Sequence, residues 1–126
     1  MTLAGRRVLI VEDHFLIAHE LSEMMAEAGA KVVGPCLTVE QALARLARKT
    51  PDCALLDVDL GNQTTSLAVA RELTRRGVPF VVVTGYGAET LAPALRAAPV
   101  ITKPFVRREL MAVIARSFGG REEKSA

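Results

Sequence analysis

Five short runs of Val, Ile and Leu recur along the chain, and each is followed by a stretch with helical periodicity. The runs cover residues 6–11, 31–34, 53–57, 79–84 and 99–102. Most of them are continuously apolar rather than alternating, which is typical of parallel strands covered by helices on both faces. This repeated pattern restricts the fold more strongly than any other feature of the sequence.

Helical patterns fill the intervals between these runs. Apolar residues recur at helical spacing over residues 15–28, 39–46, 66–76, 88–97 and 105–118. Thr38 suits an N-cap, and Gly29 and Gly77 suit C-terminal caps. The stretch 88–97 is the weakest candidate, because Pro93 interrupts it after one turn.

Five strand–helix units predict an α/β fold, a flavodoxin-like doubly wound sheet of five parallel strands with five helices. The common strand order for this class is 2-1-3-4-5, which places ligands beyond the carboxyl ends of strands one and three. A chain of 126 residues suits one domain rather than two. We therefore expect a single domain over residues 1–126, with a core of about residues 6–118 and a flexible tail at 119–126.

Charge and composition argue against several functional classes. The net charge is only +2, and the basic residues occur in short pairs, so nucleic-acid binding is not expected. No window approaches the roughly 18 apolar residues of a membrane span, and the first residues do not resemble a signal peptide. Cys36 and Cys53 lack metal-ligand or redox spacing. These features favour a reduced cytoplasmic protein without membrane contact.

Polar residues stand at the carboxyl ends of four of the five predicted strands. They are Glu12 and Asp13, Asp57, Thr84, and Lys103. A solvated loop also carries polar residues, so one such end means little. Four ends with matching chemistry on the same rim of a parallel sheet indicate a shared site.

The chemistry of these side chains is coherent. Three carboxylates brought together repel one another and raise their pKa values. Mg²⁺ relieves this repulsion and prefers hard oxygen ligands. With a divalent cation and Lys103, the acids carry no net charge, and the site can accept a phosphoryl group held also by the Thr84 hydroxyl. Asp57 is the central candidate for a carboxylate nucleophile that forms an aspartyl-phosphate.

Together these motifs resemble the receiver domain of bacterial two-component response regulators, over about residues 6–118. The matching segments are "VED" after strand one, "LLDVDL" at strand three, "VVVTG" at strand four and "TKPF" at strand five. The resemblance implies that Asp57 accepts a phosphoryl group from a sensor histidine kinase or a phosphotransfer protein. A receiver catalyses only its own phosphorylation and dephosphorylation, so we do not expect an enzyme in the usual sense.

The resemblance also implies roles for the other residues. Glu12, Asp13 and Asp57 would hold Mg²⁺, and the backbone carbonyl of Asp59 would complete the protein ligands. Thr84 would move toward the phosphoryl group, and Lys103 would bind it. The peptide bond before Pro104 is typically cis in receivers. We further expect a conformational switch read by a downstream protein partner, in a monomer or weak homodimer.

One departure from the family pattern concerns the switch. Most receivers carry Tyr or Phe three residues before the lysine, whereas this chain has Val100. The sequence resembles a receiver subgroup with a Phe-Ala-Thr-Gly-x-Tyr motif, although Val82 and Val83 replace Phe-Ala and Tyr86 comes one position early. Our hypothesis is that the usual coupling between the threonine and the aromatic residue is absent, and that the loop after strand four, which contains Tyr86, carries the switch. Tyr86 as a mere cover of the site is an equally weighted alternative.

Other readings remain open. The side chain of Asp59 has two interpretations, a role in positioning water or no role at the site, and His14 is expected to be a surface residue. "DVD" also satisfies the nucleophile motif of haloacid-dehalogenase phosphatases, but that nucleophile follows the first strand rather than the third. A P-loop or dinucleotide-binding protein is excluded by its missing glycine motifs, and a flavin binder or a degenerate receiver fits less well. The chain could also be a piece of a larger regulator or hybrid kinase.

Overall fold

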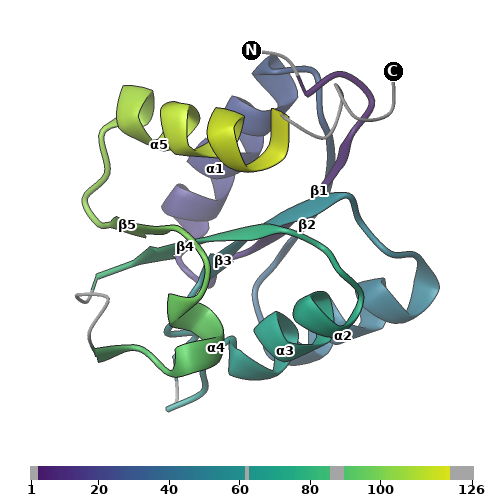
Figure 1. The fold of residues 1–126 in the computed structure, drawn as a ribbon, viewed down its shortest axis with the longest axis vertical. Helices are drawn as coiled ribbons and strands as arrows, with labels where there is room; N and C mark the ends of the chain where they lie inside the picture. Colours follow the sequence, from purple (N-terminus) through teal and green to yellow (C-terminus); the bar gives the residue numbers. More distant parts are fainter. Residues whose placement is uncertain (1–2, 62, 86–89, 120–126) are drawn as a thin grey trace.

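A parallel sheet organises the molecule, with helices on both of its faces (Figure 1). The computed structural model describes residues 3–61, 63–85 and 90–119. The strands are β1 (Arg7–Val11), β2 (Lys31–Cys36), β3 (Cys53–Asp57), β4 (Phe80–Thr84) and β5 (Val100–Thr102). All neighbours pair in parallel in the order β2-β1-β3-β4-β5, which confirms the predicted fold.

Helices α1 and α5 cover one face of the sheet, and α2, α3 and α4 cover the other (Figure 1). Their bounds are α1 (Phe15–Glu27), α2 (Val39–Arg48), α3 (Leu67–Arg75), α4 (Pro93–Arg96) and α5 (Arg107–Ile114), which continues into the π-helical turn η2 (Ala115–Gly119). Thr38 caps α2 as predicted, because its hydroxyl accepts a hydrogen bond of 3.1 Å from Gln41 N. The predicted tail at 119–126 lies outside the described residues, apart from Gly119.

The core consists of two apolar layers that share the strands. Along β1, Val8 and Ile10 pack toward α1 and α5, while Leu9 and Val11 pack toward α2 and α3. Successive strand side chains point to opposite faces, so each strand supplies both layers. This double burial explains why the strands are continuously apolar.

The prediction of a helix over residues 88–97 was wrong in its extent. Within the described residues, α4 spans only Pro93–Arg96. Pro93 opens this turn rather than interrupting a longer helix, because its fixed φ and missing N–H suit the first helical position. Leu95 is the one buried anchor of α4. A groove lined by residues that include Val78, Phe80, Ala94 and Ala97 lies beside this short helix.

Strand β2 is longer than predicted, because it runs on to Cys36 through a cis Gly34–Pro35 bond. β2 is an edge strand, where a proline without an N–H costs no sheet hydrogen bond. The register to β1 shifts opposite this proline, between Leu9 and Val11.

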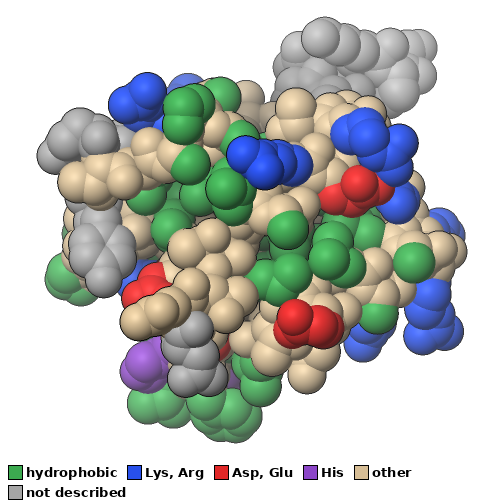
Figure 2. Space-filling view, turned by 90° about the horizontal axis from the view of Figure 1, so that it is seen from below, with side chains coloured by type: hydrophobic (Ala, Val, Ile, Leu, Met, Phe, Trp, Pro, Cys, Tyr) green, Lys and Arg blue, Asp and Glu red, His purple; other side chains and the backbone are tan. Residues whose placement is uncertain are grey.

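The face formed by α2, α3 and α4 carries basic side chains around exposed hydrophobic patches (Figure 2). Glu72 on α3 pairs with Arg75 and Arg76. Arg76 also donates hydrogen bonds to the carbonyl of Leu46 (2.8 Å) and to the hydroxyl of Thr50 (2.9 Å). This network ties α3 to the end of α2.

In the part of the chain that the structure describes, no helix has the length and apolar character needed to cross a membrane.

Candidate functional site

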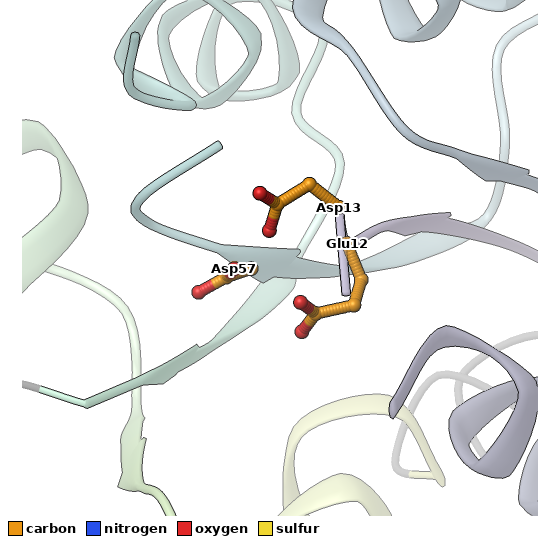
Figure 3. Close-up of side chains that lie close together, drawn as sticks. All are labelled: Glu12, Asp13 and Asp57. Atoms are coloured by element: carbon orange, nitrogen blue, oxygen red, sulfur yellow. The ribbon is translucent and has the colours of Figure 1, made fainter. Parts of the chain in front are cut away.

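The acids of the first and third strands meet at one edge of the sheet (Figure 3). β1 and β3 are neighbours, and Val11 pairs with Leu56, so Glu12 and Asp57 follow at the same level. One carboxylate oxygen each from Glu12, Asp13 and Asp57 lies within 4.8 Å of the others. The two parallel strands therefore assemble the cluster that the sequence suggested.

Lys103, which follows β5, reaches into this cluster. Its Nζ atom lies 3.0 Å from Glu12 Oε1 and 3.3 Å from Asp57 Oδ1. Its backbone N–H donates a hydrogen bond of 2.6 Å to the carbonyl of Thr84 at the end of β4. Thr84 itself is fully buried. Lys103 thus connects the ends of β4 and β5 to the acids of β1 and β3.

Burial and charge shift the acid–base properties of this group. Glu12 is fully buried and Asp57 is 6% exposed, whereas Asp13 is open to solvent. Burial first, and then the neighbouring Glu12 carboxylate, raise the pKa of Asp57 to about 7, although Lys103 opposes the shift. Burial would lower the pKa of Lys103, but its contacts with Glu12 and Asp57 outweigh burial and raise that pKa.

The donor set fits a hard divalent cation. All three side chains offer carboxylate oxygens, which Mg²⁺ prefers over sulfur or imidazole. Glu12 Oε1 is buried and forms an ion pair of 3.0 Å with Lys103 Nζ, and a carboxylate oxygen with one such contact can still accept a second from a cation. Burial first, and then repulsion from Glu12, raise the pKa of Asp57, and a bound cation would oppose both effects.

Asp59 stands apart from the other acids. Its side chain is exposed, and its Oδ1 accepts a hydrogen bond of 3.0 Å from the N–H of Gly61. The carboxylate is therefore engaged in the turn after β3. A role for the backbone carbonyl of Asp59 as a metal ligand stays a prediction.

The remaining predicted residues fall in different places. The Lys103–Pro104 peptide bond is cis. Val100 lies in β5, half-buried against the layer under α2 and α3. Tyr86 lies outside the described residues, so its relation to the site stays a hypothesis.

Two contacts at the site were missed by sequence reasoning. The backbone N–H of His14 donates a hydrogen bond of 3.1 Å to Glu12 Oε2, while the residue itself is exposed as expected. Gly61 lies against Asp13: a Cβ atom at Gly61 would stand 3.3 Å from Asp13 Oδ2. The Asp-x-Gly spacing of Asp59 and Gly61 signals the tight turn itself, but nothing in the sequence signals its contact with Asp13.

A doubly wound parallel sheet with three acids and a lysine at its carboxyl edge places the chain among the α/β proteins that gather polar side chains at this edge. Comparison with known families shows which family this is. The family model of the response regulator receiver domain matches residues 8–115, so the chain belongs to this family.

Individual relatives agree with this assignment. The transcriptional regulatory protein PdtaR of Mycobacterium tuberculosis is 31% identical over 112 residues, which cover 86% of this chain and 55% of PdtaR. The phyllosphere-induced regulator PhyR of Methylorubrum extorquens is 30% identical over 114 residues, which cover 87% of this chain and 42% of PhyR. The chain thus spans about half the length of these curated relatives.

Solved structures show the same fold. The crystal structure of the response regulator PhyR from Brucella abortus superposes with a TM-score of 0.82 at 28% identity, over 98% of this chain and 52% of that one. The sheet order and the helix placement described above are therefore those of a receiver.

Proposed function

We propose that this chain is a phosphoryl-accepting receiver in which Asp57 is the nucleophile. In the reaction, an oxygen of the Asp57 carboxylate attacks the phosphorus of a phosphohistidine. A P–O bond forms, the P–N bond breaks, and the released imidazole keeps the electron pair and takes up a proton. The product is an acyl phosphate on Asp57.

The observation that carries this proposal is the position of Asp57 between the Lys103 ammonium group and two other acids. Its Oδ1 lies 3.3 Å from Lys103 Nζ, and its neighbours are Glu12 and Asp13. Lys103 can shift its contact from the Asp57 carboxylate to the negatively charged oxygens of an incoming phosphoryl group. Thr84, at the end of the neighbouring strand β4, is in the right place in the sheet to offer its hydroxyl to the same group.

Glu12, Asp13 and Asp57 are the residues that would hold Mg²⁺, together with the backbone carbonyl of Asp59. When bound, the cation neutralises charge on the phosphoryl oxygens as the transfer proceeds. The chain's own contribution is to orient these oxygens at one edge of the sheet and to place Lys103 beside Asp57, where its charge favours the ionised carboxylate.

The partners follow from the same chemistry. The phosphodonor is a sensor histidine kinase or a phosphotransfer protein, and the output runs through a downstream protein partner. PhyR of Bartonella quintana, 29% identical to this chain, is an anti-anti-sigma factor, so a related receiver belongs to a protein that acts on proteins.

We place this chain in the cytoplasm, as a single receiver domain that is a monomer or weak homodimer, with Thr84 and Tyr86 in the switch. A receiver cut from a larger regulator would share the site.

Mass spectrometry of the intact protein tests the proposal. Acetyl phosphate with Mg²⁺ should add one phosphoryl group, and Asp57→Asn should abolish the gain. The matched control is Asp52→Asn, the same substitution just before the opposite end of β3, where the carboxylate accepts a hydrogen bond from Arg7 N. This control should be phosphorylated like the wild type. An unmodified wild-type protein would refute the proposal.

The haloacid-dehalogenase reading makes a different prediction. Such a phosphatase would release phosphate from p-nitrophenyl phosphate over many turnovers. We expect no steady release, since Asp57 follows the third strand and acts as an acceptor.

A further inference from the structure

The turn between β3 and α3 folds back onto the acid site. Gly61 in this turn has a φ of +82°, a conformation that L side chains rarely adopt. The nearest atom to the place where its Cβ would stand is Asp13 Oδ2, at 3.3 Å. The carboxylate of Asp13 therefore lies next to Gly61, on the side where any other residue would carry its Cβ atom.

A set of local hydrogen bonds fixes the position of Gly61. Its N–H donates to Asp59 Oδ1 at 3.0 Å, and its carbonyl accepts from Thr64 N at 2.8 Å. Leu60 N donates to the carbonyl of Thr64 at 2.9 Å, and Asp59 forms an antiparallel bridge with Thr65. Hydrogen bonds therefore hold the N–H and the carbonyl of Gly61 as well as the two residues before it.

We propose that Asp59 and Gly61 are positioning residues for Asp13. The Asp59 carboxylate holds Gly61 in the turn, and the Gly61 backbone limits where the Asp13 carboxylate can point, which keeps it directed toward Glu12 and Asp57. This inference rests on the proposed function, because it assigns the turn a task in Mg²⁺ binding. It gives the Asp59 side chain a role as a hydrogen-bond acceptor within the turn rather than as a charge acting on the cation.

The exposure of Asp13 makes this support necessary. A buried carboxylate such as Glu12 is held by the packing around it, whereas Asp13 is open to solvent. An exposed side chain keeps several rotamers unless a neighbour excludes some of them. Residues that orient metal ligands commonly change metal affinity by 10- to 100-fold when they are removed.

The first test compares two glycine substitutions. Gly61→Ala introduces a Cβ next to Asp13, and Gly77→Ala introduces the same strain at a φ of +72° with no atom within 4 Å. Both should lower the melting temperature. In Mg²⁺ titrations of the free protein followed by amide NMR, Gly61→Ala should weaken binding about tenfold, while Gly77→Ala should bind like the wild type.

The second test separates hydrogen bonding from charge at Asp59. Asp59→Asn keeps an oxygen that can accept from Gly61 N but removes the charge, and Asp59→Ala removes both. We expect Mg²⁺ affinity near that of the wild type for Asp59→Asn and a loss of severalfold for Asp59→Ala. Equal losses for both variants would mean that the charge acts on the cation, and would overturn the proposal.

The outcomes also distinguish this inference from the proposed function. If the wild type binds Mg²⁺ and becomes phosphorylated while Gly61→Ala binds Mg²⁺ as tightly, only the positioning role fails. If the wild type neither binds Mg²⁺ nor accepts a phosphoryl group, the proposed function fails and the positioning role fails with it.

Discussion

The two sides of the acid site are built differently. On the side of β1 and β3, the strands are buried apart from the half-buried Arg7, and the turn after β3 is closed by hydrogen bonds around Gly61. On the side of β4 and β5, the last strand has three residues and α4 has a single turn, and a groove lies at the amino ends of these two strands. Sparse packing of this kind marks the less stable parts of a fold.

This contrast suggests different functions for the two sides of the site. The side of β1 and β3 holds the proposed phosphoacceptor and metal ligands in fixed positions. The side of β4 and β5 has less packing to lose when it rearranges, so it is where we expect a response to phosphorylation. Lys103 is the described side chain that bridges the two sides, through Glu12 and Asp57.

The largest expected difference between the sides concerns two buried leucines. Leu73 on α3 and Leu95 on α4 are 0% and 2% exposed in the same apolar layer. Leu73→Ala should cost about 4 kcal/mol of unfolding free energy, and Leu95→Ala about 2 kcal/mol, because a one-turn helix can collapse into the space. Urea denaturation measures both values. Equal costs would show that the two sides are packed alike.

Breaking the bridge between the sides should be nearly as costly. Lys103→Ala leaves the buried acids Glu12 and Asp57 without their cation, and we expect a loss of about 3 kcal/mol in Mg²⁺-free buffer. Added Mg²⁺ should recover more stability in this variant than in the wild type. Lys49→Ala, on an exposed lysine at the end of α2, is the control. A loss no greater than that of the control would show that Lys103 does not compensate the acids.

Replacement of the proposed phosphoacceptor should stabilise the Mg²⁺-free protein. The pKa of Asp57 is raised to about 7 in the fold, from an ordinary value of 3.8. The folded state therefore binds the extra proton, and the cost of ionising Asp57 grows as the pH rises from about 4 to 7. The pKa shift alone corresponds to roughly 4 kcal/mol, since one pKa unit corresponds to about 1.4 kcal/mol. Asp57→Asn removes this cost but also loses the ion pair with Lys103, so it should gain about 2 kcal/mol at pH 8.

This gain should shrink as the pH falls, and at pH 4 the variant and the wild type should differ little. Urea denaturation at the two pH values checks the prediction. A gain that is the same at pH 4 and pH 8 would exclude ionisation of Asp57 as its source.

The smallest effect is expected at the surface network on α3. Hydrogen bonds from Arg75 and Arg76 lower the pKa of Glu72 to about 2. This contribution to stability is present above the ordinary pKa of 4.5 and is lost as the pH falls toward 2. Glu72→Gln should lower the urea midpoint slightly at pH 7, and 1 M NaCl should reduce the difference. A difference that grows at high salt would argue against an ion pair.

Much of the fold could be predicted because the signals are local and repeated. Continuous apolar runs specify buried parallel strands, and Thr38 specifies the start of α2. The errors occur where proline has two possible meanings. Pro93 reads as a helix breaker in sequence but begins α4, and Pro35 reads as a strand end but lies within the edge strand β2. Whether a missing N–H matters depends on the neighbours, which the sequence does not state.

The acid cluster could be predicted because parallel strands bring their carboxyl ends together. The support behind it could not. Contact between Gly61 and Asp13 joins two loops that follow different strands, and no periodicity links them. The task of the Asp59 side chain was likewise left open, because a carboxylate near a site and a carboxylate in a tight turn look the same in sequence.

The most direct test of the central claim is to locate the phosphoryl group. After reaction with acetyl phosphate and Mg²⁺, the protein is digested and the modified peptide is fragmented in the mass spectrometer. We predict one phosphoryl group per chain, on Asp57, and none on the adjacent acids. A phosphoryl group on His14, His19 or Asp59 in place of Asp57 would contradict the account.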